Sequence, residues 1–390
     1  GYGHTRGQGS VVNVLFLDQF SEPGGAQLCL CDVLDEAIQR GWRARLLVPG
    51  SGPLTAHCRN LGVRVRPLPL TVYGNGTKSA ADIARFGYDA LRCNLAVRRA
   101  IAEEAPDLIY VNGPRALTAT LGVDVPMVFH SHSLLDKSYA RRIAQFCIES
   151  ARKRGPVAVI ATSQYTAQPF LPFITPVIIY NGVADAGFLA RGARAGPLRA
   201  GMLGRIAPEK GHLDFVRAAR LLVGAGRSME FSITGKSMFS NATYEQEVRE
   251  AARGLPLEFL EWTENAGDRL RSLDVLVIPS AAIEATPRVL MEALSAGTPV
   301  VAYPSGGIPE ALRDGTTGIL TRSADPASLA DAITRLVDFP ELVPRLCHGG
   351  RHEWETRFRQ DRFQHDVCDF LELQVNQRTA ERSKPAKAAM

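Results

Sequence analysis

Short apolar runs rich in β-branched residues alternate with longer helical patterns along the chain, and this alternation constrains the fold more than any other feature of the sequence. It is typical of βαβ units, in which parallel strands are joined by crossover helices. With 390 residues, the chain also exceeds the roughly 250 to 300 residues at which a single hydrophobic core stops growing. We therefore expect an α/β protein with two domains.

The pattern divides into two series of predicted strands. The first series occupies residues 13–18, 43–48, 63–68, 108–112, 127–131, 157–162 and 176–180, with helical stretches at 26–39, 80–104 and 138–153. The second occupies residues 200–203, 230–234, 258–261, 275–279, 299–303 and 318–320. Because enough chain separates the strands for crossover helices, each half is predicted to form its own Rossmann-like, doubly wound parallel sheet.

The stretches outside these series set the expected domain boundaries. The first domain is predicted over residues 11–183 and the second over 184–356, with the small-residue stretch 184–199 as the linker. Asn181-Gly182-Val183 is either a hinge or an ordinary turn. Aromatic and aliphatic residues at helical spacing predict one long amphipathic helix over 353–373. The polar ends, 1–10 and 377–390, are predicted to be disordered.

Composition argues against several classes of function. The 45 Lys plus Arg and 40 Asp plus Glu give a formal charge of +5, which is too small for this length to indicate nucleic acid as the main partner. The sequence has no run of about 18 uncharged apolar residues and no secretory signal at its start. Seven scattered cysteines are typical of reduced thiols, so a cytoplasmic protein is expected. Cys347, His348 and His352 lack the paired spacing of zinc ligands, and no metal site is predicted.

The most informative motif follows the fourth predicted strand of the second series. Pro287 stands where a helix would begin and Gly297 where it would end, which places Glu284 in a loop and Glu292 in the helix. A helix start beside Thr286 offers backbone N–H groups and a positive dipole end, which suit a phosphate or a developing anion. The two carboxylates could grip hydroxyl groups on either side of that anion. Alternatively, Glu292 forms a salt bridge and Glu284 is a solvated loop charge.

Two cations lie in the loop after the first predicted strand of the second series. Arg205 offers a planar fork and Lys210 a mobile point charge, a pairing suited to the two phosphates of a nucleotide diphosphate. Neither Walker-type spacing nor Gly-x-Gly-x-x-Gly is present, which disfavours ATP hydrolysis and dinucleotide binding. Two cations in a loop are also a common surface feature.

Two further motifs follow predicted strands of the first series. Gly24 and Gly25 open a helix after the first strand, where backbone could approach a ligand closely, although a flexible turn explains them equally well. His130 and His132 lie at the carboxyl end of a later strand, where one imidazole could polarise a sugar hydroxyl or a phosphate. A buried histidine with a structural role is the alternative.

The helical stretch 139–154 is strongly basic. Its cations include Arg141, Arg142, Arg152, Lys153 and Arg154, interleaved with apolar residues. A solvated helix face is the favoured interpretation. Attachment to an anionic membrane surface is the more specific hypothesis.

Several motifs occur together in one order along the chain: Gly24-Gly25-Ala26, His132, Asn181-Gly182-Val183, Gly204-Arg205, Lys210-Gly211, Glu284 to Glu292, Gly306-Gly307-Ile308-Pro309-Glu310, Asp314-Gly315 and Gly318. Each is weak alone. In combination the chain resembles the family-4 (group 1) retaining glycosyltransferases of GT-B fold, from about residue 13 to 373. The resemblance implies two Rossmann-like domains facing across a cleft. It also implies a C-terminal helix, here at 357–376, that packs back on the first domain.

The resemblance further implies roles for individual residues. Arg205 and Lys210 would hold the diphosphate of a nucleotide sugar, and Glu292 would bond the ribose hydroxyls. Glu284 would contact the donor sugar, and His132 would hydrogen-bond to it. The remaining residues of the implied donor site are Gly24, Gly25, Thr286, Pro287, Arg288, Val289 and Leu290. Such enzymes need neither metal nor cofactor, in keeping with the lack of an Asp-x-Asp motif.

Three positions depart from the family pattern. Ala184 replaces the Asp that commonly follows Asn-Gly-Val, and Arg288 stands where a smaller or polar residue is frequent. His130 leaves two candidates for the active-site histidine. None of these departures touches Arg205, Lys210, Glu284 or Glu292.

The expected function is therefore metal-independent transfer of a hexose or related sugar from a UDP or GDP sugar to an acceptor hydroxyl, with retention of anomeric configuration. The acceptor would be a sugar, a lipid-linked molecule or a small molecule, and the protein a monomer or homodimer. Two alternatives stay open on the sequence: a nucleotide-sugar epimerase of the same build, and a non-catalytic protein that binds sugar nucleotides.

Overall fold

The computed structural model of the chain describes residues 11–22, 24–71, 80–192, 196–237, 242–263, 265–280 and 284–382. It contains two parallel sheets, which confirms the predicted α/β class. The chain forms two compact units. Unit 1 comprises residues 1–162, 166–179 and 363–390, and unit 2 comprises residues 163–165 and 180–362.

The first sheet has seven parallel strands in the order β3-β2-β1-β4-β5-β6-β7. Its strands are β1 (Asn13–Asp18), β2 (Arg43–Val48), β3 (Arg64–Pro67), β4 (Leu108–Asn112), β5 (Met127–Ser131), β6 (Val157–Ala161) and β7 (Val177–Ile178). All seven strands predicted in this half are confirmed, and their ends differ by at most two residues from the predicted ones.

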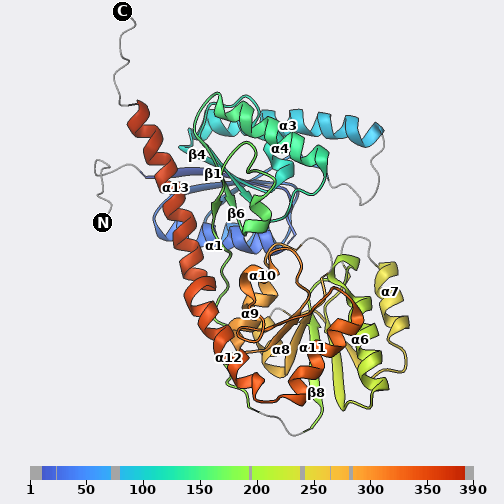
Figure 1. Ribbon diagram of the computed structural model, residues 1–390. Helices are drawn as coiled ribbons and strands as arrows, with labels where there is room; N and C mark the ends of the chain where they lie inside the picture. Colours follow the sequence, from blue (N-terminus) through green and yellow to red (C-terminus); the bar gives the residue numbers. More distant parts are fainter. Residues whose placement is uncertain are drawn as a thin grey trace, which may run out of the picture. The chain divides into compact units, whose positions relative to one another are not determined.

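Helices cover both faces of this sheet (Figure 1). One face carries α1 (Gly25–Gln39), α2 (Pro53–Asn60) and α13 (Gln360–Arg382), and the other carries α3 (Ala80–Glu104), the 3₁₀ helix η1 (Pro114–Thr120) and α4 (Ser138–Arg152). Strand β1 shows why both faces are covered. Val14 and Phe16 join the apolar cluster on the α1 side and Leu15 and Leu17 join the cluster on the α3 side, because successive side chains of a strand point to opposite faces.

The end of the chain departs from the single helix predicted over 353–373. Helix α12 (Leu342–Glu353) is followed by a π-helical turn, η3 (Trp354–Phe358), and α13 begins only at Gln360. Between them Arg359 pairs with Val183 in an isolated parallel bridge, in which the Val183 N–H donates to the Phe358 carbonyl at 2.9 Å. The prediction of one continuous helix is wrong because this backbone pairs with an extended segment 176 residues away in sequence.

The apolar residues of this segment therefore serve two cores. Trp354 and Phe358 are buried in unit 2, whereas Phe363, Val367 and Leu371 of α13 are buried against the first sheet in unit 1. The predicted helix over 357–376 thus begins three residues later than expected and belongs to the first core. It extends to Arg382, beyond the predicted start of disorder at residue 377, whereas residues 1–10 and 383–390 lie outside the described residues.

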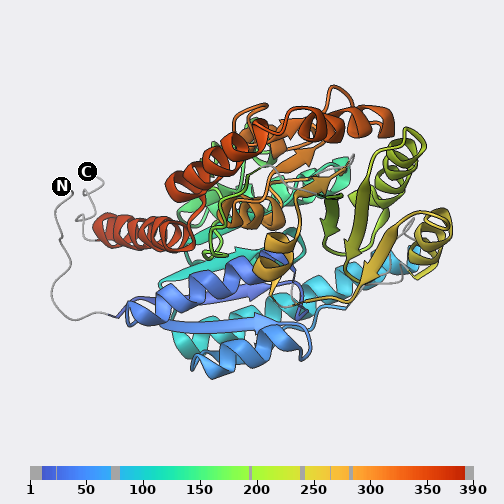
Figure 2. The same cartoon turned by 90° about the horizontal axis from the view of Figure 1, so that it is seen from below.

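The second sheet has six parallel strands in the order β10-β9-β8-β11-β12-β13. They are β8 (Leu198–Leu203), β9 (Met229–Thr234), β10 (Leu257–Leu260), β11 (Val275–Ile278), β12 (Val300–Ala302) and β13 (Ile319–Leu320), again within two residues of the predictions. One face packs on α6 (His212–Gly224), α7 (Ala242–Ala251), α11 (Pro326–Asp338) and α12, and the other on α8 (Ala266–Ser272), α9 (Arg288–Ala296), α10 (Ile308–Ala311) and η3. Figure 2 shows α6 and α11 side by side.

The stretch predicted as the linker, 184–199, lies within unit 2, and the division falls instead after Ile179. It is bound to the helix layer: the Leu189 N–H donates to the Ala296 carbonyl at 3.0 Å, and the Arg191 guanidinium donates to the Leu270 carbonyl at 3.1 Å. Its many small residues predict a linker, but hydrogen bonds to α8 and α9 hold its described part against unit 2.

Candidate active site

Each sheet reverses its strand order at one point. The chain winds outward from β1 to β2 and β3 on one side and continues from β4 on the other, and β8 and β11 form the same junction in the second sheet. Open α/β sheets bind ligands outside the carboxyl ends of the strands at this switch point. The predicted site residues fall into two sets, one at the switch point of each sheet.

In unit 2, the loops after β8 and β11 bring two predicted site residues into contact. The Lys210 ammonium forms an ion pair with Oε1 of Glu284, and the Ser280 hydroxyl donates to the same carboxylate oxygen at 3.4 Å. The side chains of Lys210 and Glu284 are 30% and 13% exposed, so both charges are only partly solvated. Glu284 is therefore not the solvated loop charge that the sequence left open.

Glycines explain how these loops approach so closely. Gly211 has φ +76°, and a Cβ there would lie 1.9 Å from the Pro279 carbonyl oxygen at the end of β11. Gly306 has φ +57°, and a Cβ there would lie 1.9 Å from the Glu284 carbonyl oxygen. The Gly307 N–H also donates to that carbonyl at 2.9 Å. The glycine motifs thus fix the backbone on either side of the Lys210–Glu284 pair.

The start of α9 lies beside this pair in sequence and suits an anion. Thr286 is 3% exposed, and its hydroxyl has no hydrogen-bond partner among the residues that the structure describes. Pro287 is the N-cap and supplies no side-chain cap, and the N-terminus of a helix carries a positive partial charge that attracts an anion. Gly297 ends the helix with φ +71°, as predicted.

The other predicted site residues of α9 differ in whether they can present a polar group to a ligand. The Arg288 guanidinium donates to the Gly182 carbonyl at 3.1 Å and lies 4.0 Å from the Glu292 carboxylate. Val289 packs against the apolar core, and Leu290 is fully buried with its N–H donated to the Pro287 carbonyl at 3.0 Å. Leu290 therefore supports the turn rather than presenting a group to a ligand.

Arg205 has its own carboxylate partner, Glu209, which is not among the predicted site residues. Its guanidinium lies 2.5 Å from Oε1 of Glu209, four residues along the chain. Although burial opposes it, a backbone hydrogen bond and the charge of Arg205 lower the pKa of Glu209. Spacing alone could have suggested this i,i+4 ion pair.

In unit 1, a polar network occupies the switch point of the first sheet. Asn112 ends β4, directly opposite Asp18 at the end of β1, and its amide nitrogen donates to Oδ2 of Asp18 at 2.5 Å. Nε2 of His132 lies 2.7 Å from Oδ1 of Asn112. Asp18 also accepts from the Gln27 amide at 2.9 Å. Asp18 and Asn112 were missed as site residues, although each is a polar residue closing an apolar run, and their strands are neighbours.

The two histidines have different surroundings. His130 is fully buried, and its Nδ1 contacts the Tyr110 hydroxyl. Burial lowers the pKa of His130 well below its usual value. His132 is half-buried and its ring lies 4.0 Å from the His130 ring. His130 therefore fits the structural role, and His132 remains the candidate for contact with a ligand.

Gly24 and Gly25 lie at the start of α1, as predicted. Gly24 is the N-cap with an extended backbone (φ −128°), so no left-handed conformation requires glycine there. A Cβ on Gly24 would lie 2.8 Å from Oε1 of Gln27. Close approach to that side chain, or to a ligand, is the remaining physical reason for this glycine.

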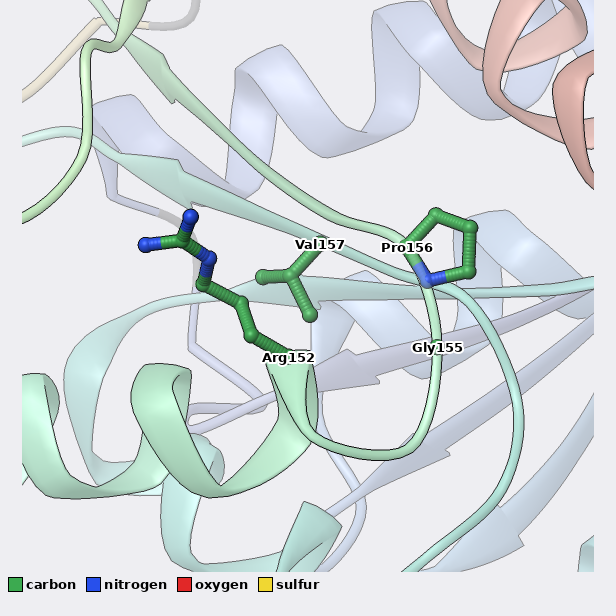
Figure 3. A pocket seen from close by; sticks show the side chains of 4 residues that line it. All are labelled: Arg152, Gly155, Pro156 and Val157. Atoms are coloured by element: carbon green, nitrogen blue, oxygen red, sulfur yellow. The ribbon is translucent and has the colours of Figure 1, made fainter.

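A surface hollow lies elsewhere in unit 1. Arg152, Gly155, Pro156 and Val157 line it, between the end of α4 and the start of β6 (Figure 3). The Arg152 guanidinium donates to the Phe173 carbonyl at 2.9 Å. Because this is the amino end of the strand, the hollow is not part of the switch-point site.

Within the described residues no group of three metal-ligating side chains occurs, and no helix there is long and apolar enough to span a membrane.

Comparison with protein families yields two matches, one in each half of the chain. The family described as "Glycosyl transferases group 1" matches residues 197–338. The family described as "Glycosyl transferase 4-like domain" matches residues 24–176. The first match contains all six strands of the second sheet, and the second match contains five of the seven strands of the first sheet, β2 to β6.

Named relatives point to the same class. The chain is 28% identical over 359 residues to phosphatidyl-myo-inositol mannosyltransferase of Mycobacterium leprae (strain TN), an alignment covering 86% of this chain and 91% of that protein. It is 41% identical over 98 residues to D-inositol 3-phosphate glycosyltransferase of Streptomyces griseus, which covers only 24% of this chain and 21% of the relative.

Solved structures share the fold. The crystal structure of Anabaena Alr3699/HepE in complex with UDP superimposes with a TM-score of 0.76 at 23% identity, covering 93% of this chain and 100% of that one. The same protein has also been solved in complex with UDP-glucose. At this identity the likeness concerns the fold, and it spans nearly the whole chain.

Proposed function

The chain belongs to the group 1 glycosyltransferases and has their GT-B fold, and on this premise we propose that it moves a hexose from a UDP or GDP sugar to an acceptor hydroxyl. The proposal includes retention of anomeric configuration and independence of metal ions. One observation carries it: at the switch point of the second sheet, Lys210 forms an ion pair with Glu284, which lies in the loop that leads to the start of α9. A cation and a helix N-terminus can together bind the negative charge of a diphosphate leaving group.

The proposed chemistry follows from where charge develops. As the bond between sugar and diphosphate breaks, negative charge grows on the diphosphate, and groups that bind it more tightly in the transition state accelerate the reaction. Lys210, Arg205 and the positive end of the α9 dipole would supply this stabilisation. A donor phosphate oxygen would help to accept the proton of the acceptor hydroxyl, which attacks on the same face of the sugar.

Both cations now have carboxylate partners, and this bears on donor binding. A diphosphate would compete with Glu209 for Arg205 and with Glu284 for Lys210. In this proposal, Glu284, once released, contacts the hydroxyl groups of the donor sugar, and Glu292 bonds the ribose. His132 hydrogen-bonds the sugar.

The nucleotide is tested by thermal unfolding with UDP, GDP and ADP sugars, because a ligand that binds only the folded protein raises its melting temperature. The solved Anabaena structures with UDP and UDP-glucose make the uridine sugar the first to try. Incubation with and without an acceptor then separates transfer from epimerisation: an altered sugar nucleotide without acceptor indicates an epimerase. Binding without turnover across an acceptor panel would contradict both enzymatic functions.

We also propose peripheral contact with an anionic membrane through α3 and α4. On α3, Tyr88, Leu91 and Leu95 are 60%, 60% and 50% exposed, and their spacing of three and four residues places them on one face. On α4, Tyr139 and Phe146 are 54% and 63% exposed. Exposed cations accompany both helices: Arg85, Arg92, Arg99, Lys137, Arg141 and Arg142. Apolar side chains among cations are typical of helices that lie on an anionic bilayer.

Sedimentation with vesicles tests this contact. The protein should sediment with phosphatidylglycerol vesicles and not with phosphatidylcholine vesicles, and Leu91→Ser with Leu95→Ser should abolish sedimentation. Leu221→Ser is the control, because Leu221 is equally exposed (50%) on α6 of unit 2. Equal binding by the α3 variant and the control would reject this surface. Cytoplasmic location remains a prediction from the cysteine pattern.

A further inference from the structure

The polar network at the carboxyl end of the first sheet restricts the protonation of one histidine. It links Asp18 at the end of β1, Asn112 at the end of β4 and His132 just after β5. We propose that Asp18 and Asn112 are positioning residues, which hold neutral His132 in the tautomer that carries its proton on Nε2. The proposal rests on the proposed function in one respect, namely that His132 contacts the donor sugar.

The orientation of the Asn112 amide follows from its partners. Its nitrogen lies 2.5 Å from a carboxylate oxygen of Asp18 and 3.1 Å from the carbonyl oxygen of Ala26. Both partners only accept when Asp18 is ionised, so the amide group must direct its two N–H bonds toward them. The opposite orientation would set the amide oxygen against two acceptors. Asn112 therefore presents its oxygen, Oδ1, to His132.

The tautomer of His132 follows in turn. Oδ1 of Asn112 has no proton to donate, and Nε2 of His132 lies 2.7 Å from it. A hydrogen bond at this distance requires the proton on Nε2. A neutral imidazole carries only one N–H, so Nδ1 then bears a lone pair and accepts hydrogen bonds.

Asp18 is held in place for this task. Its Oδ1 accepts from the Gln27 amide at 2.9 Å and from the Phe20 N–H at 2.8 Å, and the side chain is fully buried. Burial raises the pKa of Asp18 to about 6, against the hydrogen bonds from Asn112, Phe20 and Gln27. The carboxyl group is thus ionised at neutral pH.

The neighbouring groups add no charge that would change this arrangement. His130 packs against His132 and is neutral because burial lowers its pKa well below the usual value. Tyr110, which contacts His130, is neutral because burial raises its pKa well above the usual value. Asp18 is the ionised side chain of this network, and it acts on His132 through Asn112.

The consequence concerns what His132 can recognise. Because the Nε2–H group donates to Asn112, His132 can offer a ligand only the acceptor Nδ1. It therefore favours a ligand hydroxyl that donates a hydrogen bond. An imidazole that exchanges between its two tautomers could bind either a hydrogen-bond donor or an acceptor of the ligand. By fixing the tautomer, the network allows His132 only one kind of hydrogen bond to a sugar hydroxyl. This restriction would help the site to distinguish between sugars.

Nitrogen NMR of the full chain tests the tautomer directly. Protein with ¹⁵N-labelled histidine is examined at pH 8 through two-bond nitrogen–proton couplings, which distinguish a protonated ring nitrogen from one with a lone pair. The signals of His132, one of eight histidines, are identified by their loss in His132→Gln. We expect protonated Nε2 and unprotonated Nδ1 in the wild type, whereas an unconstrained imidazole in water populates both tautomers. A protonated Nδ1 or an exchange-averaged pair would overturn the proposal.

Variants separate positioning from general stability. Asn112→Leu removes the acceptor and should return His132 to a mixture of tautomers. Asn13→Leu is the matched control: Asn13 is a buried amide at the opposite end of β1, bonded to the Glu104 carbonyl, so its loss should weaken the fold without changing the His132 signals. An unchanged tautomer in Asn112→Leu would contradict the proposal, and the wild-type measurement remains decisive if this variant does not fold.

Activity provides the second measurement. Asn112→Leu should lower kcat/KM by about tenfold, the loss expected for one buried hydrogen bond, and His132→Gln should then add little to that loss. Additive losses would show that Asn112 does not act through His132 and would overturn the proposal. If His132→Gln alone leaves donor turnover unchanged, the assigned role of His132 in the proposed function fails, whereas the tautomer is judged by the NMR signals alone.

Discussion

The Lys210 ammonium and the Glu284 carboxylate are in contact although 74 residues separate them in sequence. The contact spans the switch point of the second sheet, because Lys210 follows β8 and Glu284 follows β11. The sequence predicted that Lys210 and Glu284 would contact different parts of a donor, but in the structure they contact each other. In the proposed function, a bound donor would separate the two charges, with Lys210 on the phosphate and Glu284 on the sugar.

Loss of this pair should abolish most of the activity. We expect Lys210→Ala to lower donor turnover by about 100-fold or more, comparable to the loss of a group that stabilises charge in a transition state. Lys153→Ala is the control, because Lys153 is an exposed cation at the end of α4. Initial rates with a nucleotide sugar measure the effect. Full turnover in both Lys210→Ala and Glu284→Ala would eliminate the proposed site.

Gly211 and Gly226 form a natural pair for testing the close approach of the loops. Both have left-handed backbone, with φ +76° and +75°, but a Cβ on Gly211 would meet the Pro279 carbonyl at 1.9 Å, whereas nothing lies within 4 Å of one on Gly226. Gly226→Ala should cost about 1 kcal/mol, the conformational penalty alone. Gly211→Ala should cost several times more and weaken donor binding. Equal costs in urea unfolding would show that the loop adapts.

Asp18 should make stability depend on pH in an identifiable direction. Its pKa is raised from 3.8 to about 6 in the folded protein, mainly by burial, so between these values the folded state binds more protons than the unfolded chain. Stability therefore falls as pH rises through this window, by about 3 kcal/mol for a shift of this size. Relative to Asp18→Asn, the wild type should be more stable at pH 4.5 than at pH 7. Parallel pH profiles of the unfolding free energy would contradict this.

Helix α13 offers a test of the first core. Leu371 is fully buried against the first sheet, whereas Leu373 on the same helix is 51% exposed. Leu371→Ala should lower the free energy of unfolding by about 2 to 5 kcal/mol, and Leu373→Ala by less than about 0.5 kcal/mol. Urea unfolding of the two variants measures the difference. Similar values would mean that α13 does not contribute to that core as described.

Removal of divalent metal should leave the activity intact. In the proposed mechanism, Arg205, Lys210 and the start of α9 meet the charge of the leaving diphosphate, so no cation is needed for that step. Donor turnover after treatment with EDTA should equal that of untreated enzyme. A loss restored by Mg²⁺ or Mn²⁺ would refute metal independence.

The strands of both sheets could be predicted from sequence because their signal is local. In residues 13–18 the four central residues are all apolar, and such a run is what a strand buried on both faces of a sheet requires. The break at Arg359 could not be predicted, since the local pattern there is helical and the competing partner, Val183, is distant in sequence. The same reason explains the stretch 184–199, which binds to residues of α8 and α9 rather than serving as a free linker.

The sequence by itself determined the α/β class, the strands, the resemblance to group 1 glycosyltransferases and the residue types of the site, because these depend on periodicity and on motifs within short segments. Tertiary structure decided which charges meet. It paired Lys210 with Glu284 and Arg205 with Glu209, and it joined Asp18, Asn112 and His132 in one network. Strand order alone brings the ends of β1 and β4, or of β8 and β11, side by side, and hydrogen bonds and ion pairs act only over such short distances.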